Sequence, residues 1–386
     1  MKEIYLDNAA TTAVSSAARE AMLKVLTETY GNPSSLHKKG SDAESIMRDA
    51  RESIAAMLRV KEKEIFFTSG GTESNNWAVL GGAHVKIRQG KHIITSAIEH
   101  PSVSESFRRL EQEGYELTVL PVNREGFLDP EELKKAIRPD TVLVSLMAVN
   151  NEIGTIEPTA KLGAVIKEKN PKTLFHVDAV QAFGKIPLAP KSWGVDLLTG
   201  SSHKIHGPKG SGFLYIGENV RILPLIAGGG QEKGLRSGTE NMPGIAGFGA
   251  ATKEASAGMT EHADYMRLLR KQLKNALLQL EGVSVNGPAE EELAAPHLLS
   301  ATFRGVRSEV LLHALEEKGI YVSSGSACSS HKREMSPVLK AIGMDKPSAE
   351  STLRFSLSRY NTEEEIAYVL ETLEQLLPLL RRFTRK

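Results

Sequence analysis

Short apolar runs alternate with longer stretches of helical periodicity between about residues 16 and 255 of the chain. Apolar runs of this length, bounded by turn residues, are typical of buried strands, and the stretches between them are long enough to cross over as helices. The runs are EIFFTS, KHIITSA, TVLVSLMAV, TLFHVDAV and GVDLLTGS. The pattern predicts an α/β fold with a mostly parallel sheet wrapped by helices.

The pattern changes near Ala257, where the long charged segment HADYMRLLRKQLKNALLQLEG carries apolar residues at helical spacing. Beyond it, the runs LLSATF, GIYVSSGS and TLRFSLS alternate with the helical segments SEVLLHALEEKG and SPVLKAIG, and a last helix starts at Glu363. A chain of 386 residues exceeds the usual size of one hydrophobic core. We therefore predict a large domain over 16–257 and a smaller α+β domain over 1–15 and 258–386.

Charge and hydropathy narrow the possible partners. The chain has 48 basic and 47 acidic residues, and a formal charge of +1 argues against a general nucleic-acid surface. No window approaches the roughly 18 apolar residues of a membrane span, and the start MKEIYLDNAATT lacks the apolar stretch of a secretory signal. We expect a cytoplasmic protein with no direct nucleic-acid or membrane partner.

A lysine with rigid flanks lies in the segment GVDLLTGSSHKIHGPKGSGFLYI. There Ser201, His203 and Lys204 occupy a turn rich in glycine and proline, between two apolar strands. A Schiff-base lysine needs a fixed stem and surroundings that lower the pKa of its amine, because only the neutral amine attacks a carbonyl. Lys204 meets this need better than any other lysine of the chain, and an ordinary surface-loop lysine is the alternative.

Two other polar residues follow apolar strands. The strand LFHV ends at Asp178, and the strand HIITSAIE ends at His100. In open α/β sheets ligands collect at the carboxyl ends of strands. A carboxylate there can keep a pyridinium nitrogen protonated, as pyridoxal chemistry requires, and an imidazole can stack on the ring and move protons. Gln181 is placed to donate to the phenolic oxygen of such a ring, while Asp178 as a plain helix N-cap is the alternative.

The segment FFTSGGTESNNWAVLGGA runs from a strand through Ser69–Thr72 into a helix. Glycines at this position let backbone amides close on an anion at a helix N-terminus. The segment lacks the GxxxxGK[ST] form of a nucleotide loop, and an ordinary helix start at Thr72 and Glu73 is the alternative. The sequence indicates a phosphate loop without a nucleotide-binding signature.

The segments TSGGTESNN, AIEHPSV, AVNNEIGTIEP, HVDAVQAFGKIP, SSHKIHGPKGSG, GGGQEKGLRSGTEN, SSGSACSS and LRFSLSRYNTEEEI together resemble the cysteine desulfurase family. This family consists of fold-type-I pyridoxal-phosphate enzymes related to the class V aminotransferases. The resemblance runs from YLDNAATT near the start to the last helix, and eight ordered segments make a stronger signal than any single one.

The resemblance implies roles for the residues found above. Pyridoxal 5'-phosphate would be bound covalently by Lys204, with Asp178 at the pyridine nitrogen, Gln181 at the phenolic oxygen and His100 over the ring. The phosphate would be held by Gly71, Thr72, Ser201 and His203, and by Thr239 reaching across from the other subunit of a homodimer. Asn151 and Arg354 would position L-cysteine, the arginine by gripping its carboxylate as a fork.

Cys328 is the only cysteine, so an internal disulfide is excluded and the thiol is either inert in a core or chemically used. It follows the apolar Ile320–Val322 within the polar stretch SSGSACSS, which predicts a mobile loop rather than the buried position usual for a free cysteine. The resemblance implies that Cys328 attacks the substrate sulfur and keeps it as a persulfide while alanine leaves, with His100 as the proton carrier. The acceptor is left open among an iron–sulfur cluster scaffold, a tRNA-thiolating enzyme and a thiamine-pathway carrier.

Other functions compete with this one. Transamination and selenocysteine lysis on the same fold would use Lys204 and Asp178 unchanged, and Cys328 is the residue that separates them from desulfuration. A non-catalytic binding subunit is the alternative from another class. Metal binding is not expected, because the spaced pairs His203 with His206 and His176 with Asp178 lack further ligands at a recognisable spacing.

Overall fold

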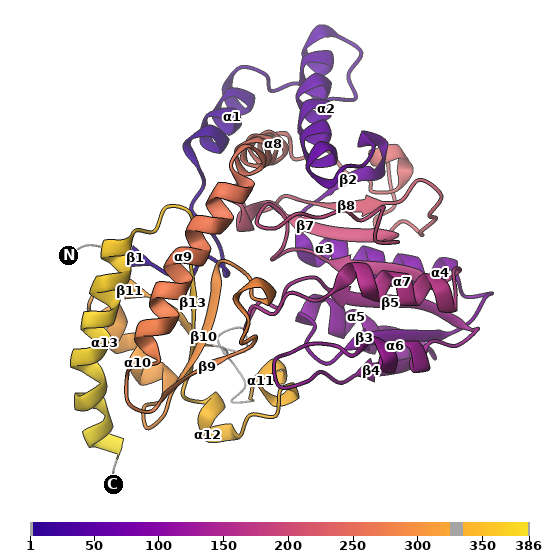
Figure 1. Cartoon of the computed structure of the whole chain (residues 1–386). Helices are drawn as coiled ribbons and strands as arrows, with labels where there is room; N and C mark the ends of the chain where they lie inside the picture. The colour runs from indigo at the N-terminus through magenta and orange to yellow at the C-terminus, as the bar shows by residue number, and fades with distance from the viewer. Residues whose placement is uncertain (1–2, 325–334, 385–386) are drawn as a thin grey trace.

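The computed structural model describes residues 3–324 and 335–384. Its larger sheet has seven strands in the order β2-β8-β7-β6-β5-β3-β4, and Figure 1 shows helices packed around it. Only β8 runs antiparallel to its neighbours, so the sheet is mostly parallel as predicted. The strands are β2 (Ile65–Thr68), β3 (His92–Ser96), β4 (Glu116–Leu120), β5 (Thr141–Met147), β6 (Leu174–Asp178), β7 (Leu197–Ser201) and β8 (Gly212–Ile216).

The central strands are buried along their whole length, which explains their continuous apolar runs. The edge strand β4 is exposed at Glu116 and Val119, and its mixed pattern gives no such run. Phe183, Phe213 and Phe248 pack ring to ring in the core, with centroids 4.9 to 6.0 Å apart. Apolar burial on both faces of the sheet therefore sets the positions of the strand ends.

Helices connect these strands and cover them. The run from Gly71 to Val85 is one continuous helix, in which a π-helical turn (Trp77–Gly81) joins α3 (Gly71–Asn76) to α4 (Gly82–Val85). Helix α8 packs against α1 and α2 beside the sheet (Figure 1). The other helices of this part are α1 (Ser16–Thr27), α2 (Lys38–Leu58), α5 (Pro101–Gln112), α6 (Pro130–Ala136), α7 (Thr159–Lys169) and α8 (Met242–Ala257), with single 3₁₀ turns at η1 (Glu62–Glu64), η3 (Ser202–Lys204) and η4 (Glu232–Gly234).

A second, antiparallel sheet has its own hydrophobic core. Its strand order is β12 (Ser323–Ser324), β13 (Thr352–Ser356), β10 (Leu298–Phe303) and β9 (Val283–Asn286). Beside it, β1 (Ile4–Tyr5) pairs in parallel with β11 (Ile320–Tyr321), so the start of the chain joins this second part. The helices here are α9 (Met259–Leu277), α10 (Ser308–Glu316), α11 (Pro337–Ala341), α12 (Lys346–Ala349) and α13 (Glu363–Thr384), with a 3₁₀ turn at η5 (Glu291–Leu293). The ranges predicted for the two domains stay a prediction.

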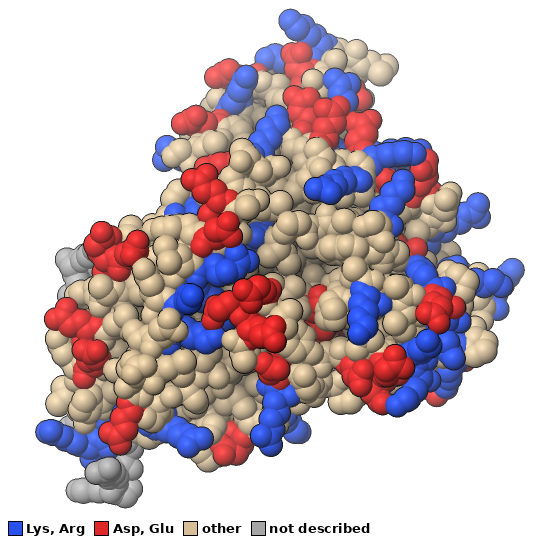
Figure 2. Space-filling view, in the orientation of Figure 1, with Lys and Arg blue, Asp and Glu red and all other residues tan. Residues whose placement is uncertain are grey.

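The described surface mixes both charges. Figure 2 shows basic and acidic side chains interspersed over one face, in keeping with the small formal charge of +1. None of the helices in residues 3–324 and 335–384 is both long and apolar enough to cross a membrane.

One buried cation ties α9 to the second sheet. The Arg270 side chain is 1% exposed, and its guanidinium donates to the carbonyl of Leu298 at 2.6 Å and to Glu291 at 2.5 Å. Lys274 donates to the other carboxylate oxygen of Glu291 at 2.6 Å. A buried guanidinium that loses its carboxylate keeps its desolvation cost, so this pair is sensitive to removal of one partner.

We expect Glu291→Ala to lower the free energy of unfolding by about 2 kcal/mol, because it leaves the Arg270 charge uncompensated. Urea unfolding followed by circular dichroism at 222 nm measures the change. The exposed neighbour Glu290 provides the control, and Glu290→Ala should shift the midpoint little. Equal shifts for both variants would contradict a special role of the Arg270–Glu291 pair.

Candidate active site

Three predicted site residues converge where parallel strands end. Asp178 is the last residue of β6, Lys204 ends the turn η3 that follows β7, and His100 follows β3 and begins α5. Burial lowers the pKa of His100, the charge of Asp178 raises it and the charge of Lys204 lowers it, so both charges lie close to the imidazole. The structure therefore gathers these three residues at one edge of the sheet.

The Lys204 amine is held by backbone carbonyls from the start of the chain. It donates to the oxygen of Ala9 at 2.5 Å and to that of Ala10 at 2.7 Å. Gln181 donates from Nε2 to the same Ala9 oxygen at 2.9 Å. The segment YLDNAATT thus places the lysine and the glutamine side by side, a role that was not predicted from its residues.

Asp178 is buried and its orientation is fixed. Asn75 Nδ2 donates to Asp178 Oδ2 at 2.7 Å, and the backbone N–H of Val180 donates to Oδ1 at 3.0 Å. Asn75 lies in α3, one turn after the predicted phosphate loop. Sequence reasoning missed Asn75, and its signal was its place in the first helical turns after TSGG.

The orientation of the Gln181 amide is set by Lys185 and His297. Its Oε1 lies 3.4 Å from Lys185 Nζ and 3.3 Å from His297 Nε2, so its Nε2 faces Ala9 and the Lys204 side. Both neighbours are buried, and burial lowers the pKa of Lys185 and of His297 well below their ordinary values, with nearby cations lowering them further. Sequence reasoning missed both residues.

The predicted phosphate loop meets the end of β7. Gly70 has a φ of 152°, which favours glycine, and a Cβ at Gly71 would lie 2.8 Å from Val180 Cγ2. Ser201 Cβ is 3.8 Å from that same position, and the buried Ser201 hydroxyl has no hydrogen-bond partner within the part of the chain that the structure describes. Thr72 is exposed in the first turn of α3. Backbone amides and an unpaired hydroxyl therefore lie together at this helix start.

His203 and Thr239 are the other two residues predicted to hold the phosphate. His203 Nδ1 lies 3.2 Å from Thr11 Oγ1, and burial together with nearby lysines lowers the pKa of His203 to about 4. Thr239 is exposed and lines a cavity of about 90 Å³ together with Ser69 and Arg236. Arg236 Nε pairs with Glu73 at 2.8 Å, which holds the loop that carries Thr239 near the start of α3.

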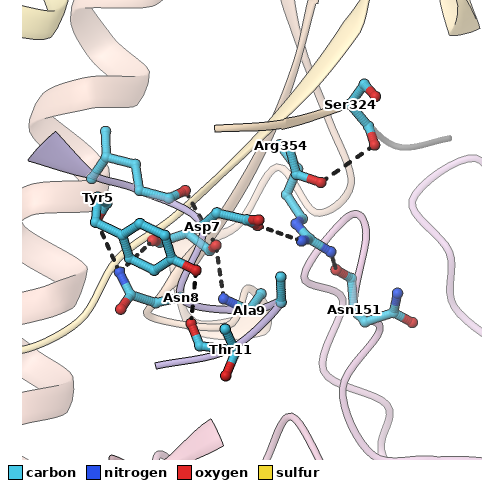
Figure 3. Close-up of polar contacts among 12 residues, drawn as sticks. Tyr5, Asp7, Asn8, Ala9, Thr11, Asn151, Ser324 and Arg354 are labelled. Atoms are coloured by element: carbon cyan, nitrogen blue, oxygen red, sulfur yellow. Dashed lines mark hydrogen bonds and ion pairs between the residues drawn. The ribbon is translucent and has the colours of Figure 1, made fainter. Parts of the chain in front are cut away.

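The predicted substrate residues contact each other at the second sheet. Figure 3 shows the Arg354 guanidinium between Asp7 and Asn151. Arg354 Nη2 donates to Asp7 Oδ1 at 2.7 Å, and Nη1 donates to the backbone carbonyl of Asn151 at 2.9 Å. Among the residues described, the buried Arg354 Nε has no hydrogen-bond partner. Asp7, which sequence reasoning missed, therefore positions a guanidinium that still has a donor available.

Arg354 lies in β13, which pairs with the short strand β12. Cys328 follows β12 in the sequence but lies outside the described residues, so its predicted role and its loop stay predictions.

The histidine pairs considered for a metal are used within the fold. His176 bonds to Ser145 at 2.7 Å and to Thr199 at 3.1 Å inside the sheet, and His206 bonds to the carbonyl of Ala13 at 3.0 Å. Across the described ranges, no three His, Cys, Asp or Glu side chains are grouped as metal ligands.

Comparisons with known proteins agree on one family. The family model "Aminotransferase class-V" matches residues 4–369. The chain is 45% identical to the cysteine desulfurase IscS of Methanosarcina thermophila, covering 99% of this chain and 94% of that protein. It is 44% identical to the mitochondrial cysteine desulfurase of Candida albicans, covering 99% of this chain and 78% of that protein.

Solved structures agree as well. A NifS-like protein superposes with a TM-score of 0.93 at 43% identity, covering 98% of this chain and all of that one. A NifS-like protein from Rickettsia africae gives a TM-score of 0.87 at 32% identity, covering 98% of this chain and 100% of the other. The chain belongs to the cysteine desulfurase family. The predicted fold class and cofactor are thereby confirmed, and the protein is a pyridoxal-phosphate-dependent cysteine desulfurase.

The geometry of this desulfurase fits the cofactor. The unpaired hydroxyl of Ser201 beside the start of α3 provides a cradle for a phosphate, and a Cβ at Gly71 would collide with Val180 there. A buried carboxylate at Asp178 suits a pyridinium nitrogen. The Lys204 amine belongs to the same cluster, as its effect on the pKa of His100 indicates. An anion cradle, a carboxylate and an amine are the three groups that pyridoxal phosphate requires.

Buried carboxyl groups surround the site of the desulfurase. Burial raises the pKa of Glu99 to about 8, that of Glu152 to about 7 and that of Glu157 to about 8. Within the described structure the Glu157 carboxyl accepts one hydrogen bond, from the backbone N–H of Leu128 at 3.3 Å, and its Oε1 has no partner. In the folded protein each of these carboxyl groups keeps its proton over a pH range in which the same group of the unfolded chain is ionised.

Ionisation of the Glu157 carboxyl should therefore lower the free energy of unfolding as the pH rises. Its pKa is about 4.5 when unfolded and about 8 when folded, so the folded state binds more protons between these values and stability falls with rising pH. We expect Glu157→Gln to be more stable than the parent by about 1 kcal/mol or more at pH 8, with a smaller difference at pH 5. Urea unfolding at both pH values measures this, and a difference independent of pH would contradict the expected titration.

Proposed function

We propose that this desulfurase takes sulfur from L-cysteine onto Cys328 as a persulfide and passes it to an acceptor protein. The observation that carries the proposal is the convergence of Lys204 and Arg354 on the segment from Asp7 to Ala10. This segment sets an amine and a guanidinium at a fixed separation, as a substrate with one α-carbon and one carboxylate requires. The names of the relatives support desulfuration over transamination or selenocysteine lysis.

Binding of the substrate uses the second sheet. The Arg354 side chain is 9% exposed and held by two contacts, and each terminal nitrogen keeps a second hydrogen that can be donated to the cysteine carboxylate. Because its orientation is set before the substrate arrives, little side-chain entropy is lost on binding. Asn151 helps through its backbone carbonyl, which accepts from Arg354.

Pyridoxal phosphate supplies the electron sink that allows the carbon–sulfur bond to break. With the cofactor bound, the Lys204 amine would take the α-proton, and the carbonyls of Ala9 and Ala10 would accept hydrogen bonds from the ammonium that results. The Cys328 thiolate then attacks the substrate sulfur, so that a sulfur–sulfur bond forms while the electron pair of the carbon–sulfur bond stays with carbon. Protonation of that carbon releases alanine, and the extra sulfur remains on Cys328.

A homodimer completes the proposed cofactor site through Thr239 of the second subunit. Support comes from large apolar side chains that are exposed in and after α1, where a single chain would leave them in water. Leu36 is fully exposed, and the other exposed side chains are Leu23, Leu26 and Tyr30. We propose that this surface contributes to the dimer.

The proposed sulfur acceptor is a cluster scaffold or a tRNA-thiolating enzyme, and we propose that the transfer takes place in the cytoplasm.

Incubation of the purified protein with L-cysteine and a thiol reductant tests the reaction. We expect equal amounts of alanine and sulfide over many turnovers, with a cofactor absorbance near about 390 to 420 nm. Cys328→Ser should keep this absorbance and lose sulfur transfer, whereas Lys204→Ala should lose the absorbance. Sulfide release by Cys328→Ser at the parent rate would contradict the persulfide, and amino transfer to a 2-oxo acid without sulfide would favour the transaminase.

Asp7→Asn tests the anchoring of Arg354. The variant keeps the size of the side chain but removes the carboxylate that pairs with the guanidinium. We expect KM for L-cysteine to rise by about 10-fold with a smaller change in kcat, because the charge-assisted hydrogen bond that orients the Arg354 guanidinium is lost. Glu3→Gln removes an exposed charge nearby and serves as the control. A lower KM in Asp7→Asn would show instead that Asp7 competes with the substrate carboxylate.

A further inference from the structure

We propose that Lys185 and His297 act on the bound cofactor through Gln181, as positioning residues that fix and polarise the amide donating to its phenolic oxygen. The inference deepens the proposed function, because it rests on Gln181 lying against that oxygen. Neither Lys185 nor His297 contacts the substrate in this scheme. They change the charge on the cofactor through one amide.

The carbonyl oxygen of Ala9 determines which way the Gln181 amide faces. A carbonyl oxygen only accepts, so the atom 2.9 Å from it is Gln181 Nε2. Oε1 lies on the other side, 3.4 Å from Lys185 Nζ and 3.3 Å from His297 Nε2. Because Oε1 also only accepts, both nitrogens donate to it, and the neutral His297 ring carries its proton on Nε2. Within the described residues His297 Nδ1 has no partner, so a proton there would lack an acceptor.

The three side chains come together from both parts of the protein. Gln181 and Lys185 lie four positions apart in the turns after β6, where the backbone N–H of Phe183 donates to the carbonyl of Ala179 at 2.8 Å. Residues four apart in such a helical turn lie on one face. His297 immediately precedes β10 of the second sheet. The amide oxygen of Gln181 therefore has one donor from its own turn and one from the second sheet.

Burial favours the uncharged forms of both donors. Lys185 and His297 are buried, His297 completely, and burial lowers the pKa of each well below its ordinary value. The charges of Lys204 and Arg354 lower both further, and Arg270 also lowers the pKa of His297. In a low dielectric, hydrogen bonds in a chain polarise one another. Two donors at Oε1 therefore make the opposite end of the amide a stronger donor.

The stronger donor changes the acid–base behaviour of the cofactor. Gln181 Nε2 has two hydrogens, of which one is donated to Ala9, and the proposed function gives the other to the phenolic oxygen. Negative charge on this oxygen helps to hold a proton on the cofactor-bound Lys204 nitrogen. A donor that draws this charge toward itself lets the proton leave at a lower pH. Lys185 and His297 thus lower the pH at which the cofactor absorbance changes.

The pH dependence of the visible cofactor absorbance tests this effect without turnover. Lys185→Met keeps the length of the side chain but removes the donor, and we expect the midpoint of the change to rise by about half a pH unit or more. His297→Leu should act in the same direction, and His297→Gln, which can place an amide N–H near the former Nε2, should shift the midpoint less. Lys191→Met, at an exposed lysine, is the control and should leave the midpoint in place. An unchanged midpoint in Lys185→Met or in His297→Leu would overturn the proposal.

Gln181→Met shows whether Lys185 acts through the amide. We expect this variant to raise the midpoint by about one pH unit or more, and Lys185→Met added to it to cause no further rise, because the link is already broken. A direct field from Lys185, or a general loosening of the fold, would add to the effect of Gln181→Met. Additive shifts would therefore overturn the proposal, as would a midpoint that Gln181→Met leaves unchanged.

Nitrogen NMR of the ¹⁵N-histidine-labelled parent checks the direction of the hydrogen bonds even if one variant is unstable. The His297 signals are identified by their absence from His297→Gln or His297→Leu. We expect a protonated Nε2 and an unprotonated Nδ1 at neutral pH, and the reverse would overturn the proposal. Neither measurement needs substrate. A parent protein with the cofactor absorbance but no sulfide would overturn the proposed function and leave both tests of this inference in force.

Discussion

The carbonyl oxygens of Ala9 and Ala10 hold the Lys204 amine, and the rest of the candidate site depends on the segment that carries them. Just before these carbonyls, Asp7 forms a bridge with Ser356 of β13 and pairs with Arg354 of the same strand. One extended segment therefore contacts the end of the large sheet on one side and the second sheet on the other. The distance between the amine and the guanidinium follows from its backbone, because the peptide geometry of so few residues leaves little freedom.

Around this segment the protein buries several groups that ionise in water, and burial disfavours their charged forms. Burial raises the pKa of Glu99 to about 8 and lowers the pKa of Lys185 and of His297 well below their ordinary values. The charges that remain beside the cofactor belong to residues with fixed partners, such as Asp178 with Asn75. A low dielectric strengthens the remaining interactions, which explains how a few groups can control a reaction that moves negative charge from a thiolate sulfur to carbon.

The sequence predicted the strand ends better than it predicted their partners. The apolar runs of the central strands end at Asp178 and precede His100 and Lys204, and the confirmed fold depends on these runs. The edge strands β4 and β9 were not predicted, because they are partly exposed and carry no continuous apolar pattern. The role of Asp7 was not predicted for another reason. Its partner Arg354 lies 347 residues further along the chain, and no local pattern indicates a contact over that distance.

The start of helix α5 shows how a predicted site residue can also serve the fold. A helix N-terminus needs an acceptor for its free N–H groups, and in a parallel α/β sheet many helices begin beside the carboxyl ends of strands, where ligands bind. His100 satisfies such a group at α5, because its Nδ1 accepts from the backbone N–H of Ser102. The sequence EHPS explains this bond, because Pro101 has no backbone N–H and Ser102 therefore provides the first backbone N–H of the helix. The spacing indicates this cap, but it does not indicate the bond from Asn75 to Ser102, because these two residues lie on different helices 27 positions apart.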